Sequence, residues 1–275
     1  MEYHQAWQNG VLSSKMHMNI SSLEVLFTPA DFSSLRECDL SMTVCVVFDV
    51  LRATSSMVTA LGNGAAAILP VEDIPQALAL REQRAEVLLA GERNGLIIGA
   101  DLTGSVSFDL GNSPREFRQE TVAGKTIVMT TTNGTRALRA CAHAKRVLIS
   151  SFLNLTVTVG SLEGADPVRL MLVCGGTHEQ AAYEDVLCAG ALCDLVWANC
   201  NQDSVSDSAL VARMLFRQER QDLLAAISRS CNGRRLLASP QLRDDVRFCV
   251  QLDSVNLVAA MDQDGLLRGS FIQLA

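Results

Sequence analysis

Short runs of apolar, β-branched residues alternate with Ala- and Leu-rich stretches along most of this 275-residue chain. The apolar runs have the length of buried strands, and the stretches between them have the length and composition of helices. This alternation predicts an α/β fold, with a mainly parallel or mixed sheet flanked by helices.

The same pattern gives the ranges of the expected elements. We predict strands at residues 43–48, 67–71, 87–90, 126–130, 146–149 and 168–174. We predict helices at residues 55–61, 74–84, 135–141, 183–198, 208–216 and 222–230. Residues 153–162 are ambiguous, because their β-branched residues favour a strand while their position between two strands favours a crossover helix. We predict a helix there.

The N-terminal segment differs from the rest of the chain. Residues 1–22 are polar and mixed in character, and they lack the charged and then apolar regions of a signal peptide. We expect a disordered tail over residues 1–22, followed by an α/β domain over residues 23–275 that is arranged in one or two lobes.

Composition restricts the compartment and the partners. The longest uncharged stretch, residues 53–71, is broken by polar residues, Gly and Pro, so no membrane span is expected. The nine cysteines include no C-x-x-C pair, which favours free thiols in the cytoplasm over disulfides or a zinc site. A net charge of −7 without a basic run argues against nucleic-acid binding. A homo-oligomer is compatible with the sequence.

Three segments share one plan, in which an apolar strand ends in a polar loop and a helix follows directly. They span residues 44–56, 126–138 and 170–190. In an open parallel sheet such loops emerge at the carboxyl ends of the strands, where ligands bind. We therefore expect the three loops to form a site.

Two of these loops place an arginine beside the start of a helix, Arg52 after Asp49 and Arg136 after Gly134. A cation at that position opposes the positive end of the helix dipole. Two such arginines are explained if an anion lies between them and interacts with both. They are explained equally well if each arginine pairs with a carboxylate.

Seven motifs occur in a fixed order along the chain. They are DVLRATSS (49–56), GERNG (91–95), FDLGNSP (108–114), TTTNGTRAL (130–138), SSFLN (150–154), CGGT (174–177) and EDVLCAG (184–190). Together they resemble the 2-phosphosulfolactate phosphatase family, and the resemblance extends from about residue 25 to the segment 243–258. It implies a magnesium-dependent phosphatase that hydrolyses 2-phosphosulfolactate to 3-sulfolactate and phosphate, a step in coenzyme M biosynthesis.

The resemblance also implies a set of site residues, because the substrate is a small, highly charged anion. We assign Asp49 as the first-choice ligand of Mg²⁺, Glu184 or Asp185 as the next, and Glu92 as a further candidate. The expected catalytic residues are Asp49, Arg52 and Arg136. The expected substrate-binding residues are Thr54, Ser55, Arg93, Asn112, Ser113, Thr132, Asn133 and Gly134.

Two mechanisms and two other functions stay open. A second Asp two positions after the first is typical of phosphatases that form an aspartyl-phosphate, and Leu51 stands there in this chain. Direct attack by water is therefore favoured, and Asp49 as a covalent nucleophile is the alternative. The other candidate functions are a phosphatase for a different phospho-hydroxy acid and a non-catalytic binding protein for such an anion.

Overall fold

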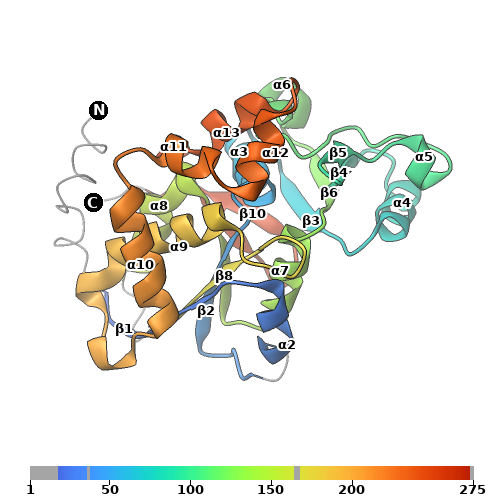
Figure 1. Ribbon diagram of the computed structural model, residues 1–275. Helices are drawn as coiled ribbons and strands as arrows, with labels where there is room; N and C mark the ends of the chain where they lie inside the picture. Colours follow the sequence, from blue (N-terminus) through green and yellow to red (C-terminus); the bar gives the residue numbers. More distant parts are fainter. Residues whose placement is uncertain (1–17, 36–37, 164–167, 273–275) are drawn as a thin grey trace.

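The computed structural model describes residues 18–35, 38–163 and 168–272. Within these ranges the centre of the fold is one ten-stranded mixed sheet with helices on both faces, which confirms the predicted α/β class (Figure 1). The strands are β1 (Ile20–Leu26), β2 (Thr43–Phe48), β3 (Ala67–Pro70), β4 (Leu88–Arg93), β5 (Leu96–Ile97), β6 (Thr126–Thr130), β7 (Arg146–Ile149), β8 (Val168–Cys174), β9 (Val258–Met261) and β10 (Leu267–Ser270).

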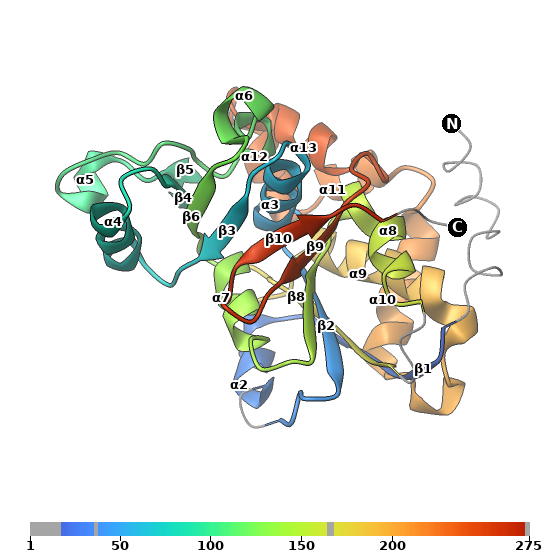
Figure 2. The ribbon, with the colours of Figure 1, turned by 180° about the vertical axis from the view of Figure 1, so that it is seen from behind.

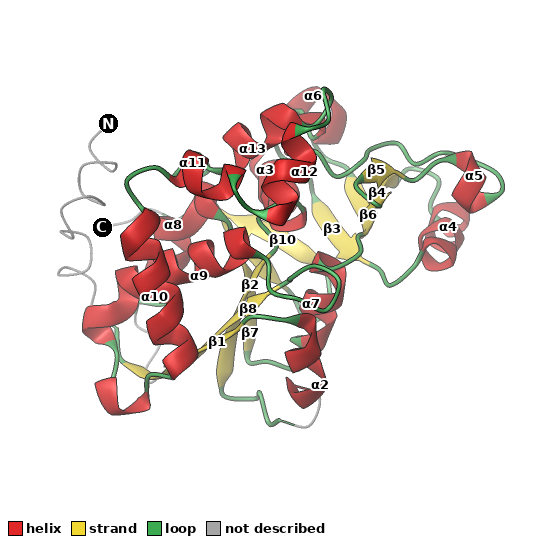
Figure 3. Cartoon of the chain, in the orientation of Figure 1, coloured by secondary structure: helices red, strands yellow, loops and turns green. Residues whose placement is uncertain are grey.

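Some helices connect consecutive strands, and others form a group near the C-terminus; Figure 3 colours helices and strands separately. They are α2 (Phe32–Leu35), α3 (Ala53–Gly62), α4 (Ile74–Gln83), α5 (Ala100–Thr103), α6 (Gln119–Val122), α7 (Gly134–Ala140), α8 (Leu155–Gly160), α9 (Tyr183–Val196), α10 (Asp207–Glu219), α11 (Leu223–Ser228), α12 (Cys231–Leu237) and α13 (Arg243–Cys249). No helix in the described ranges is long and apolar enough to cross a membrane.

The sheet consists of two groups of parallel strands joined by a hairpin. Its order is β1-β8-β2-β7-β9-β10-β3-β6-β4-β5. The first group holds β1, β8, β2 and β7, and the second holds β3, β6 and β4. Strand β9 is antiparallel to β7, and β10 is antiparallel to both β9 and β3. The strands of the second group therefore point in the opposite direction to those of the first group within the hydrogen-bonded sheet.

The hairpin is also where the sheet changes direction. Strand β10 meets β3 through one residue pair, Leu267 and Ile68, whereas β9 and β10 pair over four residues each. Figure 2 shows the hairpin between β3 and the strands of the first group. Because loops from both groups contact each other at the site described below, the sheet turns sharply at this weak junction.

Strand β2 is buried on both faces, as parallel strands commonly are. Val46 and Phe48 contribute to the core that is packed by α8 to α13, while Cys45 and Val47 contribute to the core on the side of α3 and α7. A smaller core beside α4 covers the outer part of β4 and β6. The loop that follows β2 is therefore held by packing on both sides.

The observed elements agree with most of the expected ranges. Strands β2, β6, β7 and β8 begin and end where the sequence predicts, and all six expected helices occur with shifted ends. The ambiguous segment is helical: a 3-10 turn over Phe152–Asn154 leads into α8. The crossover position therefore outweighs the β-branched composition.

The sequence pattern missed β1, β5, β9 and β10, and the short helices α2, α5, α6, α12 and α13. Strand β1 begins at Ile20, so residues 20–22 belong to the sheet and not to the tail expected over residues 1–22. Residues 1–17 of that segment lie outside the described residues.

Helices α9 and α10 pack closely at Gly190, where a Cβ atom would overlap with the backbone carbonyl of Ala212. In an unobstructed helix interior, Gly to Ala stabilises by about 1 kcal/mol. Here we expect Gly190→Ala to lower the free energy of unfolding by about 1–3 kcal/mol, because the two helices must separate. Chemical denaturation measures this change, and a gain in stability would contradict the close packing.

Candidate active site

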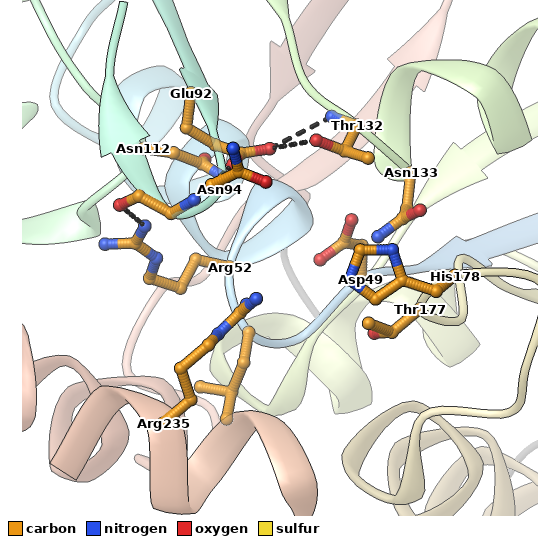
Figure 4. Close-up of a pocket in the computed structure, with 12 residues that line it drawn as sticks. Asp49, Arg52, Glu92, Asn94, Asn112, Thr132, Asn133, Thr177, His178 and Arg235 are labelled. Carbon is orange, nitrogen blue, oxygen red and sulfur yellow. Dashed lines mark hydrogen bonds between the residues drawn. The ribbon is translucent and has the colours of Figure 1, made fainter. Parts of the chain in front are cut away.

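A pocket opens where loops from both strand groups meet the C-terminal helices (Figure 4). It encloses about 480 Å³ of space, part of it open to solvent. Its lining residues are Asp49, Leu51, Arg52, Glu92, Asn94, Gly95, Asn112, Thr132, Asn133, Thr177, His178 and Arg235. The polar lining suits a small charged molecule.

Asp49 lies at the end of β2, between two glycines from neighbouring loops. A Cβ atom at Gly134 would lie 2.9 Å from Asp49 Oδ2, and one at Gly175 would lie 3.1 Å from Asp49 Cβ. The Ala53 amide donates to Asp49 Oδ1 over 3.1 Å. Oδ2 has no hydrogen-bond partner in the described part of the chain, and Figure 4 shows the carboxylate facing the pocket.

The pKa of Asp49 is raised from its ordinary value of 3.8 to about 7, and burial is the largest cause. The negative charges of Glu92 and Glu184 contribute to this rise, while the Ala53 amide and Arg52 oppose it. A carboxyl group with a pKa near neutrality can accept or donate a proton under physiological conditions.

Glu92 holds two loops at the rim of the pocket. Its Oε1 accepts hydrogen bonds from the amide and the hydroxyl of Thr132, at 3.0 and 2.9 Å, and its Oε2 accepts one from the Gly95 amide at 2.7 Å. Both oxygens are therefore engaged with protein donors, and the structure favours a bracing role over metal ligation for this residue.

Arg52 is buried in an ion pair with a residue of α13. Its Nη1 donates to Asp245 Oδ2 over 2.9 Å, and its Nη2 donates to the Gly95 carbonyl over 2.8 Å. The exposed fractions of the two side chains are 4% and 0%. Asp245 Oδ1 also accepts from Ser113 Oγ at 2.7 Å and from Arg115 Nε at 2.8 Å. Asp245 thus joins three segments beneath the pocket.

The adjacent carboxylates of α9 have different surroundings. Asp185 accepts hydrogen bonds from the amides of Val50, at 2.8 Å, and Gly176, at 3.0 Å, and so fixes the loops after β2 and β8. Burial, with the negative charges of Asp49 and Glu184, raises its pKa well above the ordinary value. Glu184 Oε1 accepts from Asn232 at 2.6 Å, whereas its Oε2 is buried without a hydrogen-bond partner.

The donor set for a metal is composed of oxygens. Among the described residues, no three His, Cys, Asp or Glu side chains form a cluster that could hold a metal ion by themselves. Asp49 Oδ2, Glu184 Oε2 and the buried, unpartnered Asn112 Oδ1 are nevertheless hard ligands without another partner in this region. Mg²⁺ prefers such oxygen ligands, takes few of them from protein and keeps waters. Asp49 and Asn112 line the pocket, whereas Glu184 lies outside its lining, and its charge contributes to raising the pKa of Asp49.

The structure brings some expected site residues into the pocket and leaves others outside its lining. Asp49, Arg52, Glu92, Asn112, Thr132 and Asn133 line it, and Gly134 contacts Asp49. Thr54 and Ser55 are buried at the start of α3: Thr54 Oγ1 accepts from the Asp49 amide, and Ser55 Oγ donates to the Val50 carbonyl. These hydroxyls fix the loop that carries Asp49.

The expected arginines have protein partners. Arg93 donates to the carbonyl of Glu92 and to Thr130, and the exposed Arg136 pairs with Glu179. Of the two explanations offered for these arginines, the structure supports pairing with carboxylates: Arg52 pairs with Asp245, and Arg136 pairs with Glu179. An anion between Arg52 and Arg136 is not needed to account for them.

The sequence pattern did not identify several residues that line the pocket or hold its loops in place. Arg235 and Asn232 lie on α12, where the sequence shows only a short polar stretch with two arginines. Asp245 belongs to the C-terminal segment that carries the resemblance, and Thr177 belongs to the CGGT motif. Both residues were therefore inside recognised segments, but neither was assigned a role. His178, which has a φ of 49°, follows Thr177 in the pocket lining.

The chain is similar to a known protein family over most of its length. A family model described as 2-phosphosulpholactate phosphatase matches residues 31–264. A protein of Caldicellulosiruptor saccharolyticus is 36% identical over 237 residues, which are 85% of this chain and 95% of that protein. One of Pseudothermotoga lettingae is 36% identical over 247 residues, 90% and 98% of the two chains. One of Thermotoga petrophila is 38% identical over 227 residues, 82% and 90%. All three are named probable 2-phosphosulfolactate phosphatase.

Removing Asp245 leaves the buried Arg52 guanidinium without its counter-charge. We expect Asp245→Ala to lower the free energy of unfolding by about 3–5 kcal/mol. The matched control is Asp244→Ala, whose carboxylate is 68% exposed and lies 3.8 Å from Arg115; its effect should stay within about 0.5 kcal/mol. Equal losses in the two variants, measured by urea denaturation, would contradict the role of the ion pair.

The raised pKa of Asp49 makes stability depend on pH. Between about pH 4 and 7 the unfolded chain has already released this proton, whereas the folded chain still holds it. The free energy of unfolding of the wild type therefore falls as the pH rises through this range. Asp49→Asn lacks this ionisation. In EDTA, its free energy of unfolding should increase relative to wild type between pH 4.5 and 8. A difference that does not vary with pH, as expected for Asp244→Asn, would contradict the burial argument.

Proposed function

The chain belongs to the 2-phosphosulpholactate phosphatase family, and we propose that it hydrolyses 2-phosphosulfolactate to 3-sulfolactate and phosphate. The observation that carries this proposal is Asp49, a buried carboxylate with one oxygen facing the pocket beside Arg52. The match covers most of the chain and most of each relative, so the proposal concerns the whole domain.

Arg52 is suited to bind the phosphoryl group. A guanidinium has five N–H donors, and Arg52 uses one toward Asp245 and one toward Gly95. The remaining donors are available to phosphate oxygens, and the ion pair with Asp245 fixes the plane of the fork. Asn133, from the loop after β6, adds a neutral amide on the Asp49 side of the pocket.

We propose Mg²⁺ as the cofactor, with Asp49 as the first ligand and Glu184 as the second. Glu184 Oε2 supports this choice because it is a buried oxygen without a partner, whereas both oxygens of Asp185 and of Glu92 accept amide hydrogen bonds. When bound, the ion would neutralise charge on the phosphoryl oxygens. Asn112 Oδ1 is a further oxygen donor in the lining.

The proposed step is direct attack of water on phosphorus. Asp49 accepts a proton from the water, the water oxygen bonds to phosphorus, and the bond from phosphorus to the sulfolactate oxygen breaks. The released alkoxide then takes up the proton from Asp49, directly or through a water molecule, which returns Asp49 to its starting state. Attack by Asp49 itself, through an acyl-phosphate, is the alternative.

The state of the cysteines bears on the compartment in which the protein acts. All nine cysteines are free, which is typical of a reducing cytoplasm. We therefore propose that the protein acts there, and that its product enters coenzyme M biosynthesis, as the family resemblance implies.

Phosphate release tests the proposed reaction. We expect the purified protein to hydrolyse 2-phosphosulfolactate with a higher kcat/KM than phospholactate or phosphoglycolate, and to lose activity in EDTA and regain it with Mg²⁺. Asp49→Asn should lower kcat by about 10²–10⁴-fold, while the exposed Asp39→Asn should not. Phosphate release from phospholactate or phosphoglycolate but not from 2-phosphosulfolactate would show that the substrate is a different phospho-hydroxy acid. No phosphate release from any of the three esters would contradict a phosphatase and favour a non-catalytic binding protein.

Isotope labelling separates the two mechanisms. In a single turnover in H₂¹⁸O, direct attack places the label in the released phosphate and none in the protein. Label in the Asp49 carboxylate, found by mass spectrometry of the peptide, would contradict direct attack and establish the covalent route.

A further inference from the structure

Arg235 lines the pocket and forms no ion pair or side-chain hydrogen bond with any residue that the structure describes, in contrast to the arginines expected from the sequence. Arg52 is held by Asp245, and Arg93 and Arg136 have partners as well. Figure 4 shows the Arg235 side chain rising from α12 toward the centre of the pocket. Its charge is therefore directed at the space that a substrate would occupy.

The helix that carries Arg235 is fixed against the site. Asn232 lies three positions earlier, on the same side of α12. Its Nδ2 donates to Thr177 Oγ1 over 2.8 Å and to Glu184 Oε1 over 2.6 Å. Ser230 caps the helix by accepting from the Gly233 amide over 2.9 Å. The face of α12 with Asn232 and Arg235 thus points at the pocket, and the Arg235 backbone is held in place before a ligand binds.

Arg235 and Arg52 approach the pocket from different elements. Arg52 precedes α3 and belongs to the loop of Asp49, whereas Arg235 comes from the C-terminal group of helices. If one anionic group of a ligand binds near Asp49 and Arg52, the Arg235 guanidinium is free to bind a second acid group of the same ligand. The fork geometry of a guanidinium suits the oxygens of a carboxylate or a sulfonate.

We propose that Arg235 is a specificity-determining residue that binds an acid group of the substrate other than the transferred phosphoryl group. This inference rests on the proposed function and adds to it a requirement: the pocket selects phosphate esters whose alcohol part carries a negative charge. Arg235 takes no part in breaking the phosphorus–oxygen bond.

Variants at two adjacent arginines test the assignment. The readout is the ratio of kcat/KM for 2-phosphosulfolactate to kcat/KM for p-nitrophenyl phosphate, which has no second acid group. Arg235→Ala should lower this ratio about 10- to 100-fold, the effect of losing a charge-assisted contact, mainly through KM. Arg235→Lys should restore part of it. Arg234→Ala is the matched control, because Arg234 interacts with the Arg229 carbonyl and Cys231 instead of the pocket.

The outcomes separate this inference from the proposed function. If wild type does not hydrolyse 2-phosphosulfolactate, the proposed function fails. If wild type hydrolyses it and Arg235→Ala keeps the wild-type ratio, the inference about Arg235 fails alone.

A binding measurement tests Arg235 without turnover. By isothermal titration calorimetry in EDTA, 3-sulfolactate should bind wild type and Arg234→Ala with equal affinity and bind Arg235→Ala at least 10-fold more weakly. Equal affinity of wild type and Arg235→Ala for 3-sulfolactate would overturn the inference.

Discussion

The buried ion pair between Arg52 and Asp245 organises the pocket more than any other contact in the structure. Two charges removed from water are tolerated only when their hydrogen bonds are satisfied, and here Ser113, Arg115 and the Gly95 carbonyl complete the set. The ion pair fixes the loop after β2 to the turn after β4 and to α13. The orientation of the Arg52 guanidinium is therefore fixed by protein contacts alone.

The sheet brings these parts together in an unusual order. Its two parallel groups run in opposite directions, and a β9–β10 hairpin joined to β3 by one residue pair lets the sheet turn between them. Loops that would lie at opposite edges of a flat sheet then meet around Asp49. Glycines at positions 134 and 175 make that meeting possible, because a Cβ atom at either position would press against Asp49.

The sequence predicts the inner strands and the strand-end residues well, because both follow from local rules. Strands β2, β6, β7 and β8 are continuous apolar runs, and polar residues that end such strands, including Asp49, Thr132 and Asn133, do line the pocket. Strands β9 and β10 are short and were missed, since VAAM and LRGS lack a strand pattern. Their pairing depends on the partners that the fold supplies.

Long-range contacts explain what the sequence could not predict in the site. Whether an arginine binds substrate or a carboxylate depends on residues far along the chain: Asp245 lies 193 positions from Arg52. Arg235 stands in a short polar helix and becomes a pocket residue because Asn232 anchors that helix to Thr177 and Glu184. Neither fact leaves a local pattern.

A crystal structure of the protein with Mg²⁺, phosphate and 3-sulfolactate tests the proposed site most directly. We expect phosphate between Asp49 and Arg52, and an acid group of 3-sulfolactate on Arg235. Phosphate and 3-sulfolactate bound elsewhere, for example in the separate cavity lined by Arg115 and Arg118, with this pocket holding neither, would contradict the proposed site.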